Sequence, residues 1–187
     1  MFQFYARKKY AERKILLVIV FVSDHVYSLG IRFHRSLITE SDLMGVIRAI
    51  NADGIVEVHE FTAALDDREF PSTVGFFLEI NGEATSMVAI IFWTCSTHVI
   101  YVGSNAGLLK AKSLEAFLAI HDNHQTLINN GVICPPTIRV VKSGTFMEYR
   151  RWKVDTMGVG MSQVKVPVVM WDSNALKWLT ERVVREL

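Results

Sequence analysis

The chain has 187 residues, of which 50% are hydrophobic and 21% are charged, and its formal net charge is +1. This length fits one domain with one core, and the near-neutral charge lacks the excess of lysine and arginine that is typical of nucleic-acid-binding domains. We therefore expect a single domain over residues 1–187, with at most a weak subdivision near 66–72. Two cysteines, Cys95 and Cys134, are too few for a disulfide framework, which favours a reducing, cytoplasmic location.

The N-terminal part combines a basic segment with an apolar run. Residues 2–14 contain five lysines and arginines and are predicted to form a short helix, and the eight apolar residues 15–22 are predicted to form a buried strand. Eight residues are too few for a transmembrane helix, which needs about 20, so no membrane anchor is expected. A second strand is predicted within 26–34.

The next segment carries the signals of a helix followed by a strand. Thr39 has the side chain of a typical N-cap, and apolar residues recur at helical spacing after it, which predicts a helix over 40–50. Residues 55–61 alternate between apolar and polar, as expected for a strand with one exposed face. The polar connector 66–72 follows.

Residues 74–80, 84–93 and 99–102 are predicted to form a three-stranded meander. Asn81 and Gly82 would join the first two strands, because both positions of this hairpin turn require a positive φ. The unbroken apolar run 87–93 indicates a strand that is covered on both faces.

The third strand of the meander leads into a helix over 105–130, which the polar residues 122–125 interrupt. Three further strands are predicted at 137–141, 146–154 and 163–170, followed by a helix over 173–187. The fold class is therefore α+β, with a mostly antiparallel, meandering sheet covered by the helices 40–50, 105–130 and 173–187.

The turn between residues 102 and 107 is a candidate anion site. Its two glycines allow close backbone approach, and the start of the following helix offers free amide groups and a positive dipole end. Lys110 is near enough to assist. The predicted anion-binding residues are Gly103, Ser104, Asn105, Gly107 and Lys110, although the segment matches neither the dinucleotide fingerprint nor the lysine-bearing phosphate loop.

No metal site or catalytic set is predicted. His121 and His124 have a spacing that can hold zinc, but no third ligand accompanies them and the break at Asp122 would separate their faces. Cys95 lies near His98 in a polar turn, without a motif that would lower the pKa of its thiol. We therefore expect no cofactor.

Aromatic and basic residues near the C-terminus suggest an interaction surface. Trp178 lies off the apolar stripe of the last helix, where an exposed indole either stacks under an arginine or contacts another subunit. The predicted interface comprises Trp178, Arg182, Arg185, Tyr149 and Trp152. Residues 146–153 also have the composition of a single-stranded nucleic-acid platform, but as a strand neither of their faces is cleanly basic.

The leading functional hypothesis is a non-enzymatic structural subunit of a homo- or hetero-oligomeric assembly, because the apolar content exceeds the needs of an isolated domain. Its partners would be protein subunits rather than nucleic acid or membrane. One alternative is a small anion- or nucleotide-binding enzyme that uses residues 103–107. A second is single-stranded nucleic-acid binding through residues 146–153.

Overall fold

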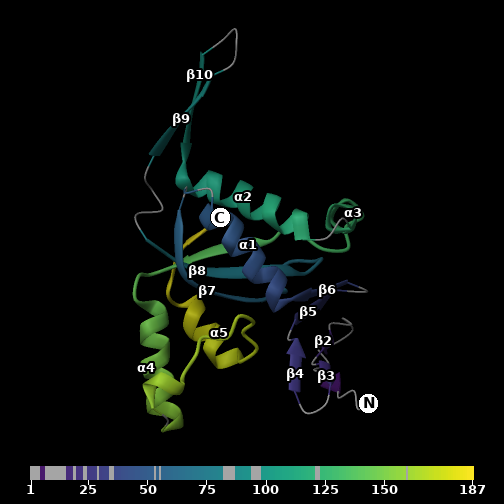
Figure 1. The fold of residues 1–187 in the computed structure, drawn as a ribbon, viewed down its shortest axis with the longest axis vertical. Coiled ribbons are helices and arrows are strands. Elements are labelled where there is room, and N and C mark those ends of the chain that lie inside the picture. Colours follow the sequence, from purple (N-terminus) through teal and green to yellow (C-terminus); the bar gives the residue numbers. More distant parts are fainter. Residues whose placement is uncertain are drawn as a thin grey trace.

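A computed structural model describes the chain at residues 5–6, 16–18, 20–22, 25–28, 30–33, 36–52, 54, 56–81, 87–93, 98–120, 123–158 and 160–187. Its centre is a four-stranded mixed sheet with the strand order β12-β11-β8-β7 (Figure 1). The strands are β7 (Glu57–Asp66), β8 (Thr73–Asn81), β11 (Thr137–Val141) and β12 (Val183–Glu186). β8 is antiparallel to β7 and parallel to β11, and β11 is antiparallel to β12. The α+β class predicted from the sequence is confirmed, with one parallel pair in this sheet.

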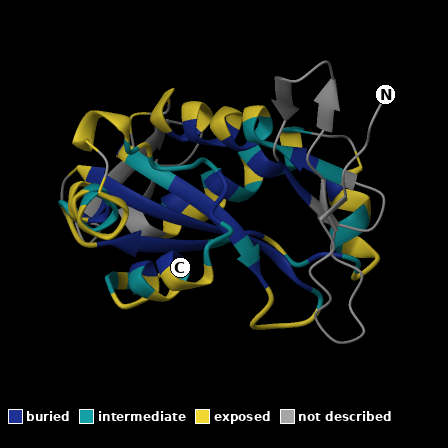
Figure 2. Cartoon of the chain, turned by 90° about the horizontal axis from the view of Figure 1, so that it is seen from below, coloured by how far each residue is buried: buried dark blue, intermediate teal, exposed yellow. Residues whose placement is uncertain are grey.

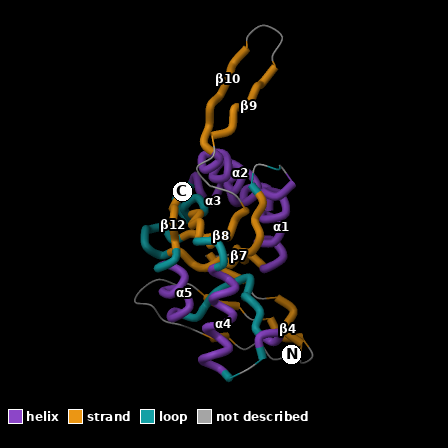
Figure 3. Tube along the Cα trace, turned by 90° about the vertical axis from the view of Figure 1, so that its left-hand side faces the viewer, coloured by secondary structure: helices purple, strands orange, loops and turns teal. Residues whose placement is uncertain are grey.

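Among the described residues, five helices lie around the central sheet. They are α1 (Glu40–Ala52), α2 (Asn105–Ile120), α3 (His124–Asn129), α4 (Thr145–Met157) and α5 (Ser173–Thr180), and a short 3-10 turn, η1, spans Met161–Gln163. α1 and α2 lie on one side of β7 and β8, and α4 and α5 lie on the other (Figure 3). No helix in the described part of the chain is long and apolar enough to cross a bilayer.

β8 is buried on both faces, and its alternating side chains divide the core into two parts. Phe76 and Leu78 pack with the apolar faces of α1 and α2, whereas Phe77 packs with Phe146 of α4 and Leu179 of α5. Burial is therefore concentrated in the strands, and the outer sides of the helices are exposed (Figure 2). This arrangement explains much of the high apolar content, because a sheet covered on both faces needs two apolar layers.

The remaining strands form smaller sheets. β1 (Tyr5–Ala6), β2 (Leu16–Val18), β5 (Gly30–Phe33) and β6 (Ser36–Thr39) make one sheet, and β3 (Val20–Val22) pairs with β4 (His25–Ser28). β9 (Met87–Trp93) and β10 (His98–Ser104) form an antiparallel ribbon that extends away from the central sheet (Figure 1).

Several predicted elements are confirmed. α1 begins after Thr39, whose hydroxyl accepts from the backbone N–H of Asp42 at 3.3 Å while the Asp42 carboxylate accepts from the Thr39 backbone N–H at 2.8 Å. This reciprocal cap satisfies the first free donors of the helix. The predicted break between α2 and α3 is also present, and β11 has the predicted bounds of 137–141.

The predicted meander is only partly correct. β9 and β10 pair as expected, but among the described residues β8 pairs with β7 and β11 rather than with β9. The Asn81-Gly82 turn extends outside the described residues. The predicted N-terminal helix over 2–14 is also wrong at the two residues that are described there, because Tyr5–Ala6 is the strand β1.

The predicted strand over 146–154 is wrong, because this segment is the helix α4. Its start is capped by a carboxylate that is distant in the sequence. Glu79, buried on β8, accepts from the backbone N–H of Gly144 at 2.8 Å and from that of Phe146 at 3.0 Å. An acid at this end satisfies free N–H groups and favours the helix dipole. The local alternation of aromatic and basic residues could not reveal this tertiary cap.

Two further C-terminal predictions are wrong. The segment 163–170 contains the end of η1 and an extended stretch with a single bridge from Val169 to Ala63. The helix predicted over 173–187 ends at Thr180, and the chain continues as β12. The β-branched Val183 and Val184 favour a strand, and the edge of β11 is available to pair with it.

We predict that Glu79→Ala destabilises the protein by about 1–3 kcal/mol, because the backbone N–H groups of Gly144 and Phe146 at the start of α4 lose their acceptor. Glu79→Gln keeps one acceptor oxygen and should cost less than Glu79→Ala. Urea denaturation followed by circular dichroism measures both values. Equal stability of the wild type and Glu79→Ala would contradict the capping role.

Candidate functional site

An open pocket of about 580 Å³ lies at one end of the central sheet. β7 and β12 end there, and β8 and β11 begin there. Ionic, hydroxyl and proline side chains line it, with contributions from the connector after β7, from α2 and from the loop before β11. The lining residues are Asp66, Arg68, Glu69, Pro71, Thr73, Lys110, Cys134, Pro135, Pro136, Thr137, Glu186 and Leu187.

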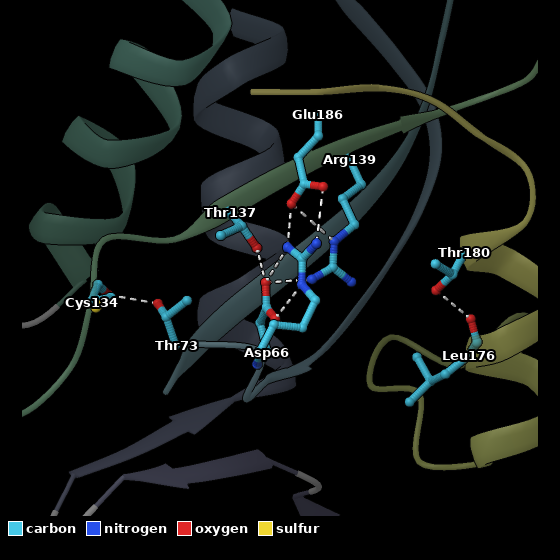
Figure 4. Close-up of polar contacts among 9 residues, drawn as sticks. Asp66, Thr73, Cys134, Thr137, Arg139, Leu176, Thr180 and Glu186 are labelled. Atoms are coloured by element: carbon cyan, nitrogen blue, oxygen red, sulfur yellow. Dashed lines mark hydrogen bonds and ion pairs between the residues drawn. The ribbon is translucent and has the colours of Figure 1, made fainter. Parts of the chain in front are cut away.

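An ion pair between two non-adjacent strands lies beside the pocket. Asp66 of β7 pairs with Arg139 of β11, although β8 runs between these strands (Figure 4). Gly75 of β8 makes this contact possible. A Cβ atom added there would lie 3.1 Å from the Thr137 hydroxyl oxygen, 3.3 Å from the Asp66 Cβ and 3.4 Å from an Arg139 guanidinium nitrogen. The absence of a side chain at Gly75 therefore leaves room for the ion pair to cross β8.

Asp66 is the centre of a larger network. One of its carboxylate oxygens, Oδ2, accepts from Arg68 Nη2 at 2.8 Å, from the Thr137 hydroxyl at 2.7 Å and from Arg139. Arg68 extends the network by donating from Nη1 to Glu186 on β12 at 3.0 Å. The side chains of Asp66 and Arg139 are only 4% and 8% exposed, whereas that of Arg68 is 50% exposed. The network thus has a buried part and a part that faces the pocket.

The electrostatics keep both acids ionised. Burial by itself would raise the pKa of the Asp66 carboxyl, but hydrogen bonds from Arg68 and Thr137 and the charges of Arg139 and Arg68 outweigh burial and hold this pKa well below its usual range. The hydrogen bond from Arg68 is also the main cause that lowers the pKa of Glu186, against a smaller effect of burial. Neither group is therefore suited to donate a proton near neutral pH.

Two charged residues of the pocket stand outside this network. Glu69, in the connector after β7, and Lys110, on α2, make no ion pair or hydrogen bond with any described residue. Both are exposed. The pocket therefore offers one carboxylate and one ammonium group that can bind a ligand without breaking an internal contact.

The loop before β11 is tied to the sheet. The hydroxyl of Thr73, at the start of β8, donates to the backbone carbonyl of Cys134 at 2.6 Å. Pro135 and Pro136 follow and continue the wall of the pocket. Because proline restricts φ and has no backbone donor, this wall is stiff and has few hydrogen-bonding groups.

The predicted anion site is only partly described. β10 runs directly into α2 at Ser104 and Asn105, as expected, and Gly107 lies in the first turn of the helix. The structure does not describe the side chains of residues 103–106, so the anion site stays a prediction. Of the members of that set whose side chains are described, Lys110 lines the pocket at the end of the sheet.

Four of the five predicted interface residues come together. The indole rings of Trp152 on α4 and Trp178 on α5 stack at 5.8 Å with an angle of 13° between their planes, and Tyr149 meets Trp178 edge-on at 6.1 Å. The Arg182 guanidinium lies 3.5 Å from the centre of the Trp178 ring. Stacking under an arginine was one of the two environments expected for Trp178. Arg185 is on β12, opposite Val140, and a subunit interface at these residues stays a prediction.

The two histidines whose spacing could hold zinc cannot be compared in the structure, because His121 lies outside the described residues. His124 is buried, stacks on Phe117 with ring centres 4.7 Å apart, and has its Nδ1 3.0 Å from the Phe117 carbonyl oxygen. Within the described ranges no three His, Cys, Asp or Glu side chains are grouped as a metal site requires. Cys95 is likewise not described.

The Asp66 network was not predicted from the sequence. The polar connector is expected to begin at residue 66, whereas Asp66 is the last, buried residue of β7. The available signal was Arg139, which lies between apolar neighbours in the middle of β11, because a cation there requires a partner when the strand is central.

We predict that Asp66→Ala destabilises the protein by about 3–5 kcal/mol, since it leaves the buried guanidinium of Arg139 without its main partner. Asp67→Ala is the matched control, because Asp67 is exposed and should change stability by less than about 0.5 kcal/mol. Denaturant unfolding of both variants measures the difference. Equal effects at the two positions would contradict the network.

The lowered pKa of Asp66 also predicts an acid-dependent loss of stability. A carboxyl whose pKa is lower in the folded than in the unfolded protein stabilises the fold above the unfolded value, about 3.9, and this contribution is lost as pH falls through the folded pKa. Urea unfolding at a series of pH values from 6 to 2.5 should show this loss. Asp66→Asn should lose stability less steeply below pH 4, and an unchanged slope would contradict the assignment.

Comparison with known proteins identifies the family. The family described as the GH3 family C-terminal domain matches residues 41–174, which is more than half of the chain. A comparison with curated proteins found no match.

Two solved structures share the fold. One, "GH3.15 acyl acid amido synthetase", superposes with a TM-score of 0.62 at 18% identity, over 92% of this chain and 31% of that chain. The other, "AtGH3.15 acyl acid amido synthetase in complex with 2,4-DB", gives a TM-score of 0.61 at 17% identity, over 92% of this chain and 30% of that chain. This chain thus spans about a third of the length of the structures that it matches.

These findings overturn the hypothesis of a non-enzymatic structural or assembly subunit. The high apolar content and the lack of a catalytic motif motivated that hypothesis, but the family match assigns the chain to a domain of an enzyme family. The apolar residues that suggested a partner are in large part buried in the two core layers. The chain belongs to the GH3 family and corresponds to its C-terminal domain.

Proposed function

We propose that this chain serves as the C-terminal domain of an acyl acid amido synthetase, an enzyme that joins an acyl acid to an amine through an amide bond. The family match over residues 41–174 is the observation that carries this proposal. The common fold over 92% of the chain supports it.

The length relation favours a contributing domain over a complete enzyme. Since the chain aligns with about a third of each matched structure, the remaining two thirds would supply the other parts of the active site. The described residues of this chain are consistent with such a division, because the acids in its charged pocket are held ionised by arginine and are not suited to proton transfer.

The proposal predicts that the chain restores amide formation to a synthetase that lacks its own C-terminal domain. A fragment of GH3.15 without the region that aligns with this chain would be mixed with, or fused to, this chain. It would then receive an acyl acid such as 2,4-DB, a panel of amines and ATP to activate the acid. We expect an amide product by mass spectrometry from the combination and none from either part alone.

Two controls make the result interpretable. The C-terminal domain of GH3.15 itself, supplied in the same way, shows that the truncated fragment accepts a separate domain. A second GH3 C-terminal domain of similarly low identity shows that sequence divergence does not prevent function. Amide formation with both control domains but not with this chain would contradict the proposal.

A further inference from the structure

We propose that α4 is a lid, which swings away from the central sheet as one unit about Gly144 while the strands and the other helices stay folded. The proposal concerns this domain alone and does not depend on amide formation. It rests on the backbone at the two ends of α4, on the burial of its residues and on the contacts that hold it closed.

The two ends of α4 have the backbone of a hinge and of a loose tether. Gly144 precedes the helix with a φ of 84°, and Gly158 follows it with a φ of 66°. A Cβ atom added at either position would meet no atom within 4 Å, so neighbouring groups do not confine these turns. Beyond the helix, the described residues of 158–165 are exposed, apart from the half-buried Val164. This stretch can therefore follow a movement of α4 without breaking a core contact.

The buried residues of α4 lie in its first half and belong to one of the two cores. They are Thr145, Phe146 and Tyr149, whereas residues 155–157 at the other end are exposed. Phe146 and Tyr149 pack in the core on the side of α4 and α5, and the sheet separates this core from the one beneath α1 and α2. Opening α4 thus removes contacts from one core and leaves the other intact.

Polar contacts from three neighbouring elements hold α4 closed. Glu79 of β8 accepts from backbone N–H groups at its start, and Glu60 of β7 accepts from Arg150 Nη1 at 2.9 Å. Lys153 donates to Asp172, the N-cap of α5, at 2.7 Å. When the helix opens, water takes the place of each of these partners, so each contact costs little free energy to break.

The residue beneath α4 connects the lid to the ionic network. Phe77 of β8 belongs to the same core as Phe146, and its ring centre lies 4.8 Å from the guanidinium carbon of Arg139. Opening α4 exposes one side of Phe77 and gives water a route to the buried end of the network. The lid therefore controls the exposure of the Arg139 ion pair from this face of the sheet.

Native-state hydrogen exchange of the full chain tests the lid. Exchange of the backbone amides is followed by NMR at a series of urea concentrations below the unfolding transition. A lid predicts that the amides of residues 148–154 share one opening free energy, which is lower and less dependent on urea than that of the amides in β8 and α1. Fraying predicts instead that exchange becomes slower, residue by residue, from Met157 toward Tyr149.

Two variants separate the opening of α4 from the unfolding of the whole domain. Glu79→Ala removes the cap and should speed exchange of the α4 amides by about 5- to 150-fold. Leu43→Ala leaves a cavity in the core beneath α1, so it should speed exchange in α1 and β8 but leave the α4 amides unchanged. Ile50→Val is a smaller change in the same core and takes its place if Leu43→Ala does not fold.

Three results would overturn the proposal. The first is exchange of the α4 amides with the free energy and urea dependence of β8, or with a gradient from one end of the helix. The second is unchanged exchange of these amides in Glu79→Ala, and the third is their faster exchange in the variant of the other core. Since none of these measurements involves amide formation, they are separate from the test of the proposed function.

Discussion

The ion pair between Asp66 and Arg139 is the interaction that organises this end of the molecule. It connects β7 to β11 across β8, and it can form because Gly75 has no side chain. A buried ion pair contributes little net stability by comparison with apolar packing, but removing one partner is costly. The pair therefore constrains which side chains can occupy three neighbouring strands, and through Arg68 and Glu186 it includes β12 as well. The charged residues that line the pocket lie at the ends of the strands that these ion pairs connect, and the prolines lie in the adjoining loops.

The two faces of the sheet use different interactions. On the side of α1 and α2 the contacts are mainly aliphatic, with Leu43, Ile50 and Leu109 among the fully buried residues. On the side of α4 and α5 aromatic rings and cations predominate, and the stacked Trp152 and Trp178 join the two helices. Lys153 contributes by lying 4.8 Å from the Trp152 ring and pairing with Asp172, the N-cap of α5. The aromatic residues that suggested an external partner thus make contacts within the domain.

The sequence predicted those elements whose stabilising contacts come from residues close by in the chain. α1 follows from the cap at Thr39 and from apolar residues at helical spacing, and both features can be read from a few neighbouring residues. α4 could not be predicted in this way, because its cap comes from Glu79, 67 residues before Phe146. β12 was read as helix for a related reason, since its strand conformation depends on the edge of β11. The fold class was therefore predictable, and these two elements were not.

The pocket was harder to predict than the fold. Its lining residues come from the ends of several strands, from α2 and from two connectors, and no short motif contains them. Lys110 was singled out for a different reason, its nearness to the glycine-rich turn, and it is a pocket residue by virtue of the packing of α2. Arg139 was the strongest sign that could have been noticed, because an arginine between apolar neighbours in a central strand requires a counter-charge.

The strand order also has a consequence for how the domain assembles. β7 and β8 are neighbours in the sequence and can form a hairpin early, whereas the partners in the ionic network are 73 residues apart for Asp66 and Arg139 and 118 apart for Arg68 and Glu186. Closing such long loops is slow, because chain entropy is lost before the contacts that repay it are made. We therefore expect β12 to pair with β11 late in folding. The pocket then forms only when nearly the whole domain is native, because Glu186 and Leu187 belong to its lining.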